Sequence, residues 1–137
     1  MSIIAGLFLT VSLGSMLNPP AVIVTLDNNA GPKVAFFAFM LTSIISHFLS
    51  VILGSLLGML FNASGRTSDK LKIFLKLDKL PTISYTLFVV GNFSLVFAIA
   101  LAIYTTFGLI SGIVFAAVGF VLGGLMPMLI NAFGFLP

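Results

Sequence analysis

The residues of this sequence that could do chemistry are few, and they lie in apolar surroundings. They are Asn18, Pro19, Pro20, His47, Asn92, Pro127 and Asn131. Two consecutive prolines remove two backbone donors from a helix and free the carbonyls one turn earlier. Freed carbonyls and nearby amides favour a polar solute pathway, as in the broken helices of transporters. The alternative is a kink at Asn18–Pro20 that only shapes helix packing.

His47 is the only histidine, and Ser43, Ser50 and Gly54 share its helix face by spacing. An ionisable residue at membrane depth indicates a functional site by default. The alternative, which we favour at this stage, is a neutral imidazole hydrogen-bonded to a serine or a carbonyl across a helix interface. One histidine without further ligands predicts no metal site, and we expect no cofactor.

The sequence lacks the residues that several kinds of chemistry require. The apolar stretches contain no Asp or Glu, and no nucleophile–base pair or phosphate loop is visible. We therefore expect no enzyme. Cysteine is absent, which excludes a disulfide or a thiolate site. The sequence pI of about 9.6 comes from one basic loop, so we expect no nucleic-acid partner.

The composition places these residues in a membrane protein. Charged residues make up 7% of the 137 residues, hydrophobic residues 60%, and the mean hydropathy is +1.28. A soluble domain carries about 25% charged residues. No small soluble fold could bury this much apolar surface. The sequence therefore predicts a polytopic integral membrane protein of the all-α class.

Spanning helices need about 20 apolar residues, and four segments fit, at roughly 3–26, 34–60, 83–105 and 109–133. We expect them to form a single transmembrane helical domain over residues 1–137. The first helix should break at Asn18-Pro19-Pro20, near mid-membrane.

Basic residues gather in the loop at 62–80, which carries Arg66, Lys70, Lys72, Lys76 and Lys79. The positive-inside rule places this loop in the cytoplasm, and with four spans both termini lie there too. Ser68 is a plausible N-cap and Pro81 a plausible stop for a short amphipathic helix. Its lysines would meet lipid head groups or a partner, or would only set topology, which we favour.

Small residues predict close helix packing, within the chain or to another subunit. The glycine pairs lie four residues apart: Gly54 and Gly58, Gly108 and Gly112, and Gly119 and Gly123. Asn92 and Ser94 add polar groups that need partners on neighbouring helices.

One resemblance adds to this interpretation. The run Leu13-Gly14-Ser15-Met16-Leu17-Asn18-Pro19-Pro20, then Asn29-Ala30-Gly31-Pro32-Lys33 and the Gly54-to-Gly58 helix, resembles the first two helices of LysE-superfamily exporters. The nearest branch is the sulfolipid- and peptidoglycolipid-addressing one, whose later helices carry a Gly-rich span ending near a Pro, as Gly119–Pro127 does. The family has about six spans, so this chain is shorter. The resemblance implies export of a small polar or lipidic solute along a pathway centred on Asn18–Pro20.

Two functional hypotheses follow. The first is a small permease of the exporter type that moves a small polar or lipidic solute as a homo-oligomer. The second is a non-catalytic accessory subunit that packs in a larger membrane complex. The expected partners are membrane lipids and further membrane subunits. The broken first helix favours the permease, whereas the lack of intramembrane charge favours the subunit.

Overall fold

The computed structural model describes residues 2–125, and these residues form helices joined by short connections. The elements are α1 (Ser2–Leu17), α2 (Ala21–Thr25), α3 (Gly31–Ala63), α4 (Thr67–Lys76), α5 (Lys79–Phe107), α6 (Leu109–Phe120) and a π-helical segment, η1 (Val121–Leu125). No strand occurs in this part of the chain, which confirms the predicted all-α class for it.

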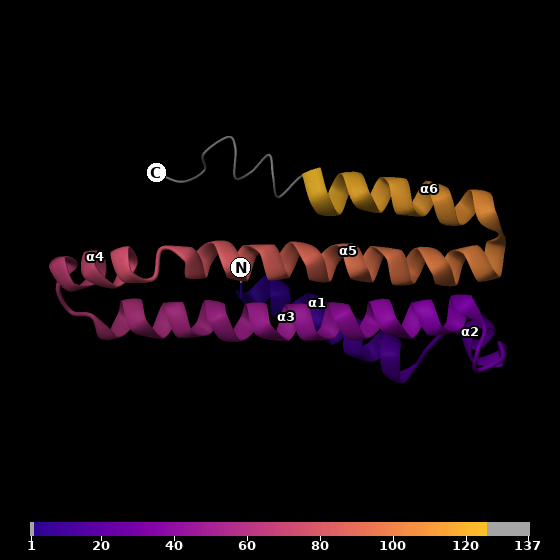
Figure 1. The fold of residues 1–137 in the computed structure, drawn as a ribbon, viewed down its shortest axis with the longest axis horizontal. Coiled ribbons are helices and arrows are strands. Elements are labelled where there is room, and N and C mark those ends of the chain that lie inside the picture. Colours follow the sequence, from indigo (N-terminus) through magenta and orange to yellow (C-terminus); the bar gives the residue numbers. More distant parts are fainter. Residues whose placement is uncertain (1, 126–137) are drawn as a thin grey trace.

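The long helices α3 and α5 lie side by side and run antiparallel, and the other elements are arranged around them (Figure 1). α1 packs beside the middle of α3, while α6 packs on α5 (Figure 1). α2 lies at one end of the α3–α5 pair, and α4 joins the two helices at the other end (Figure 1).

Prolines and one glycine mark where the helices begin and end. Pro32 lies in the first turn of α3, where a missing N–H leaves no helical bond unmade. α5 ends at Phe107, and the following Gly108 has a φ of 95°, in the left-handed region that favours glycine. This residue turns the chain back so that α6 lies along α5.

By length and composition, α3 with 33 residues and α5 with 29 residues are each able to cross a membrane. α1 has 16 residues and α6 has 12, so each is shorter than a full span. The predicted fourth span at 109–133 begins where α6 begins, and its last part, residues 126–133, lies outside the described residues.

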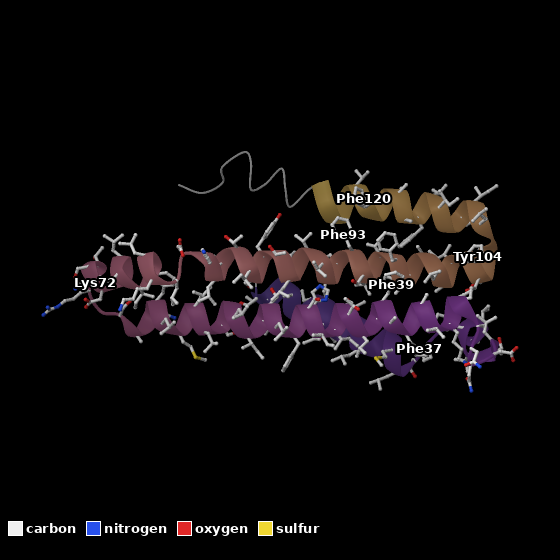
Figure 2. The ribbon with its side chains drawn as sticks, in the orientation of Figure 1. Phe37, Phe39, Lys72, Phe93, Tyr104 and Phe120 are labelled. Carbon is white, nitrogen blue, oxygen red and sulfur yellow. The ribbon has the colours of Figure 1, made fainter. Side chains whose placement is uncertain are left out.

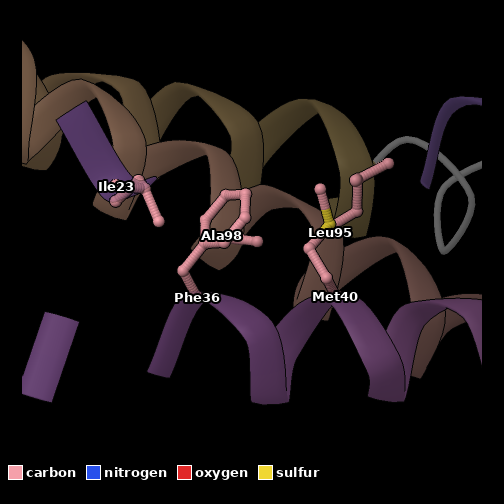
Figure 3. Packing of buried hydrophobic residues seen from close by; sticks show 5 residues of the cluster. All are labelled: Ile23, Phe36, Met40, Leu95 and Ala98. Carbon is pink, nitrogen blue, oxygen red and sulfur yellow. The ribbon is translucent and has the colours of Figure 1, made fainter. Parts of the chain in front are cut away.

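The predicted first segment is interrupted at Asn18-Pro19-Pro20, between α1 and α2. The Asn18 N–H still donates to the Gly14 carbonyl at 2.9 Å, and the Pro20 carbonyl accepts from Ile23 at 2.9 Å. The break redirects the chain, and Ile23 on α2 becomes fully buried. It packs in a core cluster with Phe36, Met40, Leu95 and Ala98 from the two long helices (Figure 3).

Lys33 fastens the connection between α2 and α3. Its Nζ donates to the carbonyls of Val24 at 3.0 Å and Leu26 at 2.8 Å, and to Asn28 Oδ1 at 3.0 Å. The carbonyls at the end of α2 lack helical donors, and the Lys33 ammonium supplies them with hydrogen bonds. Its positive charge also interacts favourably with the negative end of the helix.

The connection at 62–80 contains the predicted short helix, but its ends differ from those expected. α4 begins at Thr67, one residue before the proposed cap Ser68, and ends at Lys76. Lys79 therefore begins α5 and is on a different helix from Lys72 and Lys76. Pro81 does not stop a helix: it lies in the first turn of α5, where proline is tolerated because that N–H has no helical acceptor.

Candidate functional site

A chain of buried polar side chains connects α1, α3 and α5. Ser12 Oγ lies 2.9 Å from Ser43 Oγ, which lies 3.2 Å from His47 Nδ1. On the far side of the ring, His47 Nε2 lies 3.1 Å from Asn92 Oδ1. At the first end, Ser12 Oγ is 2.9 Å from the Phe8 carbonyl oxygen. We call Ser12, Ser43, His47 and Asn92 the polar chain.

The polar chain lies at the middle of the two long helices. His47 is the central residue of α3, and Asn92 is adjacent to the centre of α5. Ser12, Ser43 and His47 have no exposed surface, and Asn92 is 6% exposed. Burying unpaired polar groups would be costly, so the hydrogen bonds between these side chains are a condition of the packing.

The imidazole is enclosed by aromatic rings and by a glycine. The Phe8 ring is stacked on His47 with a centroid distance of 5.6 Å and an interplanar angle of 14°. The Phe88 ring approaches at 5.9 Å and 72°. On the α5 side the ring lies against Gly91, where an added Cβ would come within 2.8 Å of His47 Cε1. Glycine is required here because the ring occupies the space of a side chain.

A second polar contact joins α3 and α5, about one helical turn from His47 along α3. Ser50 Oγ donates to the Ser84 carbonyl at 3.0 Å, and Ser84 Oγ donates to the Ser50 carbonyl at 3.2 Å. Both serines are buried. This reciprocal pair fixes the register of the two helices on one side of His47.

The proline break lies apart from the polar chain. Asn18 is exposed, and Pro19 and Pro20 are half-buried. Pro19 and Pro20 have no N–H, so the carbonyls of Ser15 and Met16 have no helical donor. Of the predicted pathway residues, the structure brings His47 and Asn92 together and leaves Asn18 on the surface; Pro127 and Asn131 lie outside the described residues.

The predicted packing glycines divide into those that lie at a helix contact and those that have open space beside them. A Cβ at Gly112 would come within 2.8 Å of Tyr104 Cβ, and one at Gly119 within 2.6 Å of Val96 Cγ1, so both lie at the α5–α6 contact. Gly54 faces Ser2 of α1 in the same way, at 3.3 Å. A Cβ at Gly123 would lie 4.0 Å from Val96 Cγ2, which is at the outer limit of contact.

Gly58 and Gly108 differ from this pattern, since a Cβ on either would meet nothing within 4 Å. Gly108 serves the turn after α5 and not a helix contact, because its φ is positive.

Aromatic rings complete the contacts of α5: Phe39 of α3 stacks on Phe97 at 5.5 Å, and Phe93 meets Phe120 of α6 at 4.9 Å (Figure 2).

The basic residues of the 62–80 connection are exposed. Lys70, Lys72 and Lys76 are on α4, and Lys72 projects away from the long helices (Figure 2). Leu71 and Leu75 on the same helix are 60% and 68% exposed. α4 thus presents apolar and cationic side chains together, the combination expected of a helix at a lipid surface.

Ser43, His47 and Asn92 have the hydroxyl, imidazole and amide of a nucleophilic site. The surroundings do not suit that chemistry, because the fully buried Ser43 hydroxyl is closed to a substrate. Within residues 2–125, no group of three His, Cys, Asp or Glu side chains could hold a metal ion. The polar chain is instead a continuous line of hydrogen bonds that runs from Ser12 to Asn92.

Sequence reasoning identified Ser43, His47 and Asn92 but missed Ser12, Ser84 and Gly91. Ser12 is one of several hydroxyl residues in the first apolar segment, with Thr10 and Ser15 close by, and such residues commonly bond their own helix. Its helical bond to Phe8 is that ordinary one, and only the cross-helix contact to Ser43 distinguishes it. Comparison with family models, with curated proteins and with solved structures finds no match for this chain.

Proposed function

We propose that this chain is a membrane-embedded permease of the exporter type that moves a small polar or lipidic solute as a homo-oligomer. The observation that carries the proposal is the polar chain at the middle of the two helices long enough to span a membrane. Polar and ionisable residues at membrane depth are costly and mark solute or ion pathways. The resemblance of the first two helices to LysE-superfamily exporters agrees with this proposal.

The outer face of α3 supports a membrane-spanning arrangement. Large apolar side chains recur along it at helical spacing and are 38–53% exposed: Leu41, Ile45, Phe48, Ile52 and Leu56. An apolar stripe of this length needs lipid or another apolar helix as its neighbour. We propose four spans: α1 with α2, then α3, then α5, and a fourth that begins with α6. The basic connection at 62–80 and both termini would lie in the cytoplasm.

The depth of the proline break follows from the contacts of α1. Ser12 lies opposite Ser43, and α1 runs antiparallel to α3, so Asn18 is level with about residue 37. That level is about 15 Å along α3 from His47, at 1.5 Å per residue. The hydrocarbon core extends about 15 Å from its centre. In this arrangement the break lies at the edge of the core, and not near mid-membrane as the sequence alone suggested, and an exposed Asn18 meets water there. The proposed pathway therefore centres on His47 and Asn92 instead of Asn18–Pro20.

An accessory subunit is the second candidate, and one observation favours it. Every member of the polar chain has a hydrogen-bond partner within the chain. A subunit that only packs would need this internal satisfaction, because no solute completes its bonds. The two functions therefore differ in whether the polar chain is used or is only structural.

Flux from reconstituted vesicles separates the two candidates. The probes are labelled amino acids, a labelled polyol and a fluorescent phospholipid. For a permease, wild type should move at least one probe. His47→Gln should lose that flux while staying folded, because an amide keeps hydrogen bonds but replaces the ring.

Thr42→Val is the matched control, since Thr42 is exposed and bonds only the Ala38 carbonyl of its own helix. It should leave flux unchanged. A folded His47→Gln variant with undiminished flux would remove His47 from the pathway. Wild type without flux of any probe, isolated only together with a defined second chain, would favour the accessory subunit.

A further inference from the structure

The hydrogens available to the polar chain can be counted. Four contacts lie at hydrogen-bond distance: Phe8 carbonyl to Ser12, Ser12 to Ser43, Ser43 to His47 Nδ1, and His47 Nε2 to Asn92 Oδ1. Each contact needs one hydrogen between its two atoms. Each hydroxyl supplies one, and a carbonyl oxygen supplies none.

A neutral imidazole leaves this chain one hydrogen short. Asn92 Oδ1 is an acceptor, so Nε2 carries the ring hydrogen and Nδ1 accepts from Ser43. Ser43 then has no hydrogen left for Ser12, and Ser12 must donate to Ser43 instead of to Phe8. The contact between Ser12 Oγ and the Phe8 oxygen, at 2.9 Å, is left without a hydrogen.

We propose that His47 is a proton-binding site at the centre of the α3–α5 pair, with Ser43 and Ser12 as the relay that accommodates the proton. With one proton added, Nδ1–H donates to Ser43, the Ser43 hydroxyl donates to Ser12, and the Ser12 hydroxyl donates to the Phe8 carbonyl. Each hydroxyl keeps one hydrogen and reverses its direction, and Nε2–H still donates to Asn92. One proton enters, the imidazole becomes imidazolium, and all four contacts are filled.

The groups that face the His47 ring can stabilise an imidazolium, but they include no charged group that would hold the proton permanently. They are Phe8 from α1, Ser43 from α3, and Phe88, Gly91 and Asn92 from α5, and none of these carries a charge. The stacked Phe8 ring offers its negative face to an imidazolium. Since these groups hold no counter-ion, the bound proton can also be released.

This inference deepens the proposed permease function by naming the proton as the ion that the site binds. It is tested without any solute, so a failed titration and a failed flux assay are separate results. The chain has a single histidine, so a protein labelled with ¹⁵N-histidine reports His47 alone. The spectrum distinguishes the Nε2–H tautomer, the Nδ1–H tautomer and the imidazolium.

The full chain in lipid nanodiscs is titrated from about pH 8.5 to about pH 4.5, a range that brackets the ordinary imidazole pKa. We expect a reversible change from the Nε2–H tautomer to the imidazolium, with helical circular dichroism unchanged. A neutral ring throughout the range would overturn the proposal. So would a fixed Nδ1–H tautomer, which a rotated Asn92 amide would produce. Protonation that occurs only as the helices unfold would overturn it as well.

Two serine variants test the relay. Ser43→Ala removes the acceptor of Nδ1–H, so His47 should lose its protonation over the same range. Ser50→Ala is the matched control, because Ser50 is a buried serine of the same helix that bonds Ser84 and not the polar chain. It should keep the wild-type transition. Equal transitions in the two folded variants would exclude Ser43 as a relay, and the wild-type titration stands even where a variant fails to fold.

Discussion

Replacing Gly91 with alanine should destabilise the protein, although alanine is the better helix former. An added Cβ would lie 2.8 Å, 2.9 Å and 3.0 Å from Cε1, Nε2 and Nδ1 of His47. The ring has little room to move, because Phe8 is stacked on it and both nitrogens are hydrogen-bonded. Either the ring shifts and loses those bonds, or α3 and α5 move apart.

The size of the effect follows from two opposed contributions. Overpacking a buried contact costs about 1–3 kcal/mol. Exchanging a glycine for alanine inside a helix returns about 0.5–1 kcal/mol. The net loss in the free energy of unfolding should be about 1 kcal/mol at mid-range, with about 2.5 kcal/mol as the upper limit. Gly58→Ala is the matched control within a long helix, because a Cβ there meets nothing within 4 Å. It should be neutral or stabilising by about 0.5–1 kcal/mol.

The assay is unfolding by SDS in mixed micelles, followed by helical circular dichroism. The contact itself is tested in a His47→Ala background, where Gly91→Ala should become neutral or stabilising because the ring is gone. If Gly91→Ala matches Gly58→Ala in otherwise wild-type protein, the close approach of α5 to the His47 ring is wrong. If its cost persists without the ring, the strain lies elsewhere.

The remaining predictions concern the register of the helices and the orientation of the chain. Ser50→Ala should lower the unfolding free energy by about 0.5–1.5 kcal/mol in the same SDS assay, since it removes the bond to the Ser84 carbonyl. A cost near zero would show that the serine pair does not stabilise the helix contact. The chain has no cysteine, so single-cysteine variants report topology directly. Arg66→Cys should react with an impermeant thiol reagent only from the cytoplasmic side, and Asn29→Cys only from the opposite side. Labelling of both from one side would refute the orientation of α3.

Local patterns predicted the elements of this fold better than their ends. Continuous apolar runs predicted helices, and the consecutive prolines predicted the interruption between α1 and α2, because both effects act within a few residues. Pro81 was misjudged for a physical reason: proline disrupts a helix interior but fits the first turn, and the sequence does not show which turn it occupies.

The sequence predicted only the part of the candidate site that lies within one helix. Ser43 and His47 lie four residues apart in one helix, so their shared face follows from the helical repeat. The partners from α1 and α5 depend on how three helices pack, which spacing does not determine. Asn92 was expected to need a cross-helix partner without that partner being known. Gly91 could not be distinguished from other helical glycines, because its role is to leave space for the His47 ring.

One member of the polar chain, Ser12, lies on the helix that ends at the break, and this connects the two proposals. Ser12 and Asn18 are six residues apart, about 9 Å along α1. α1 ends at Leu17 without a helical hydrogen bond to α2, and Ile23 of α2 is held in the core by contacts of its own. A displacement of α1 at Asn18 would also move the Ser12 hydroxyl away from Ser43. Under the proposed function, the protonation of His47 and the position of α1 at the membrane edge are therefore coupled through Ser12.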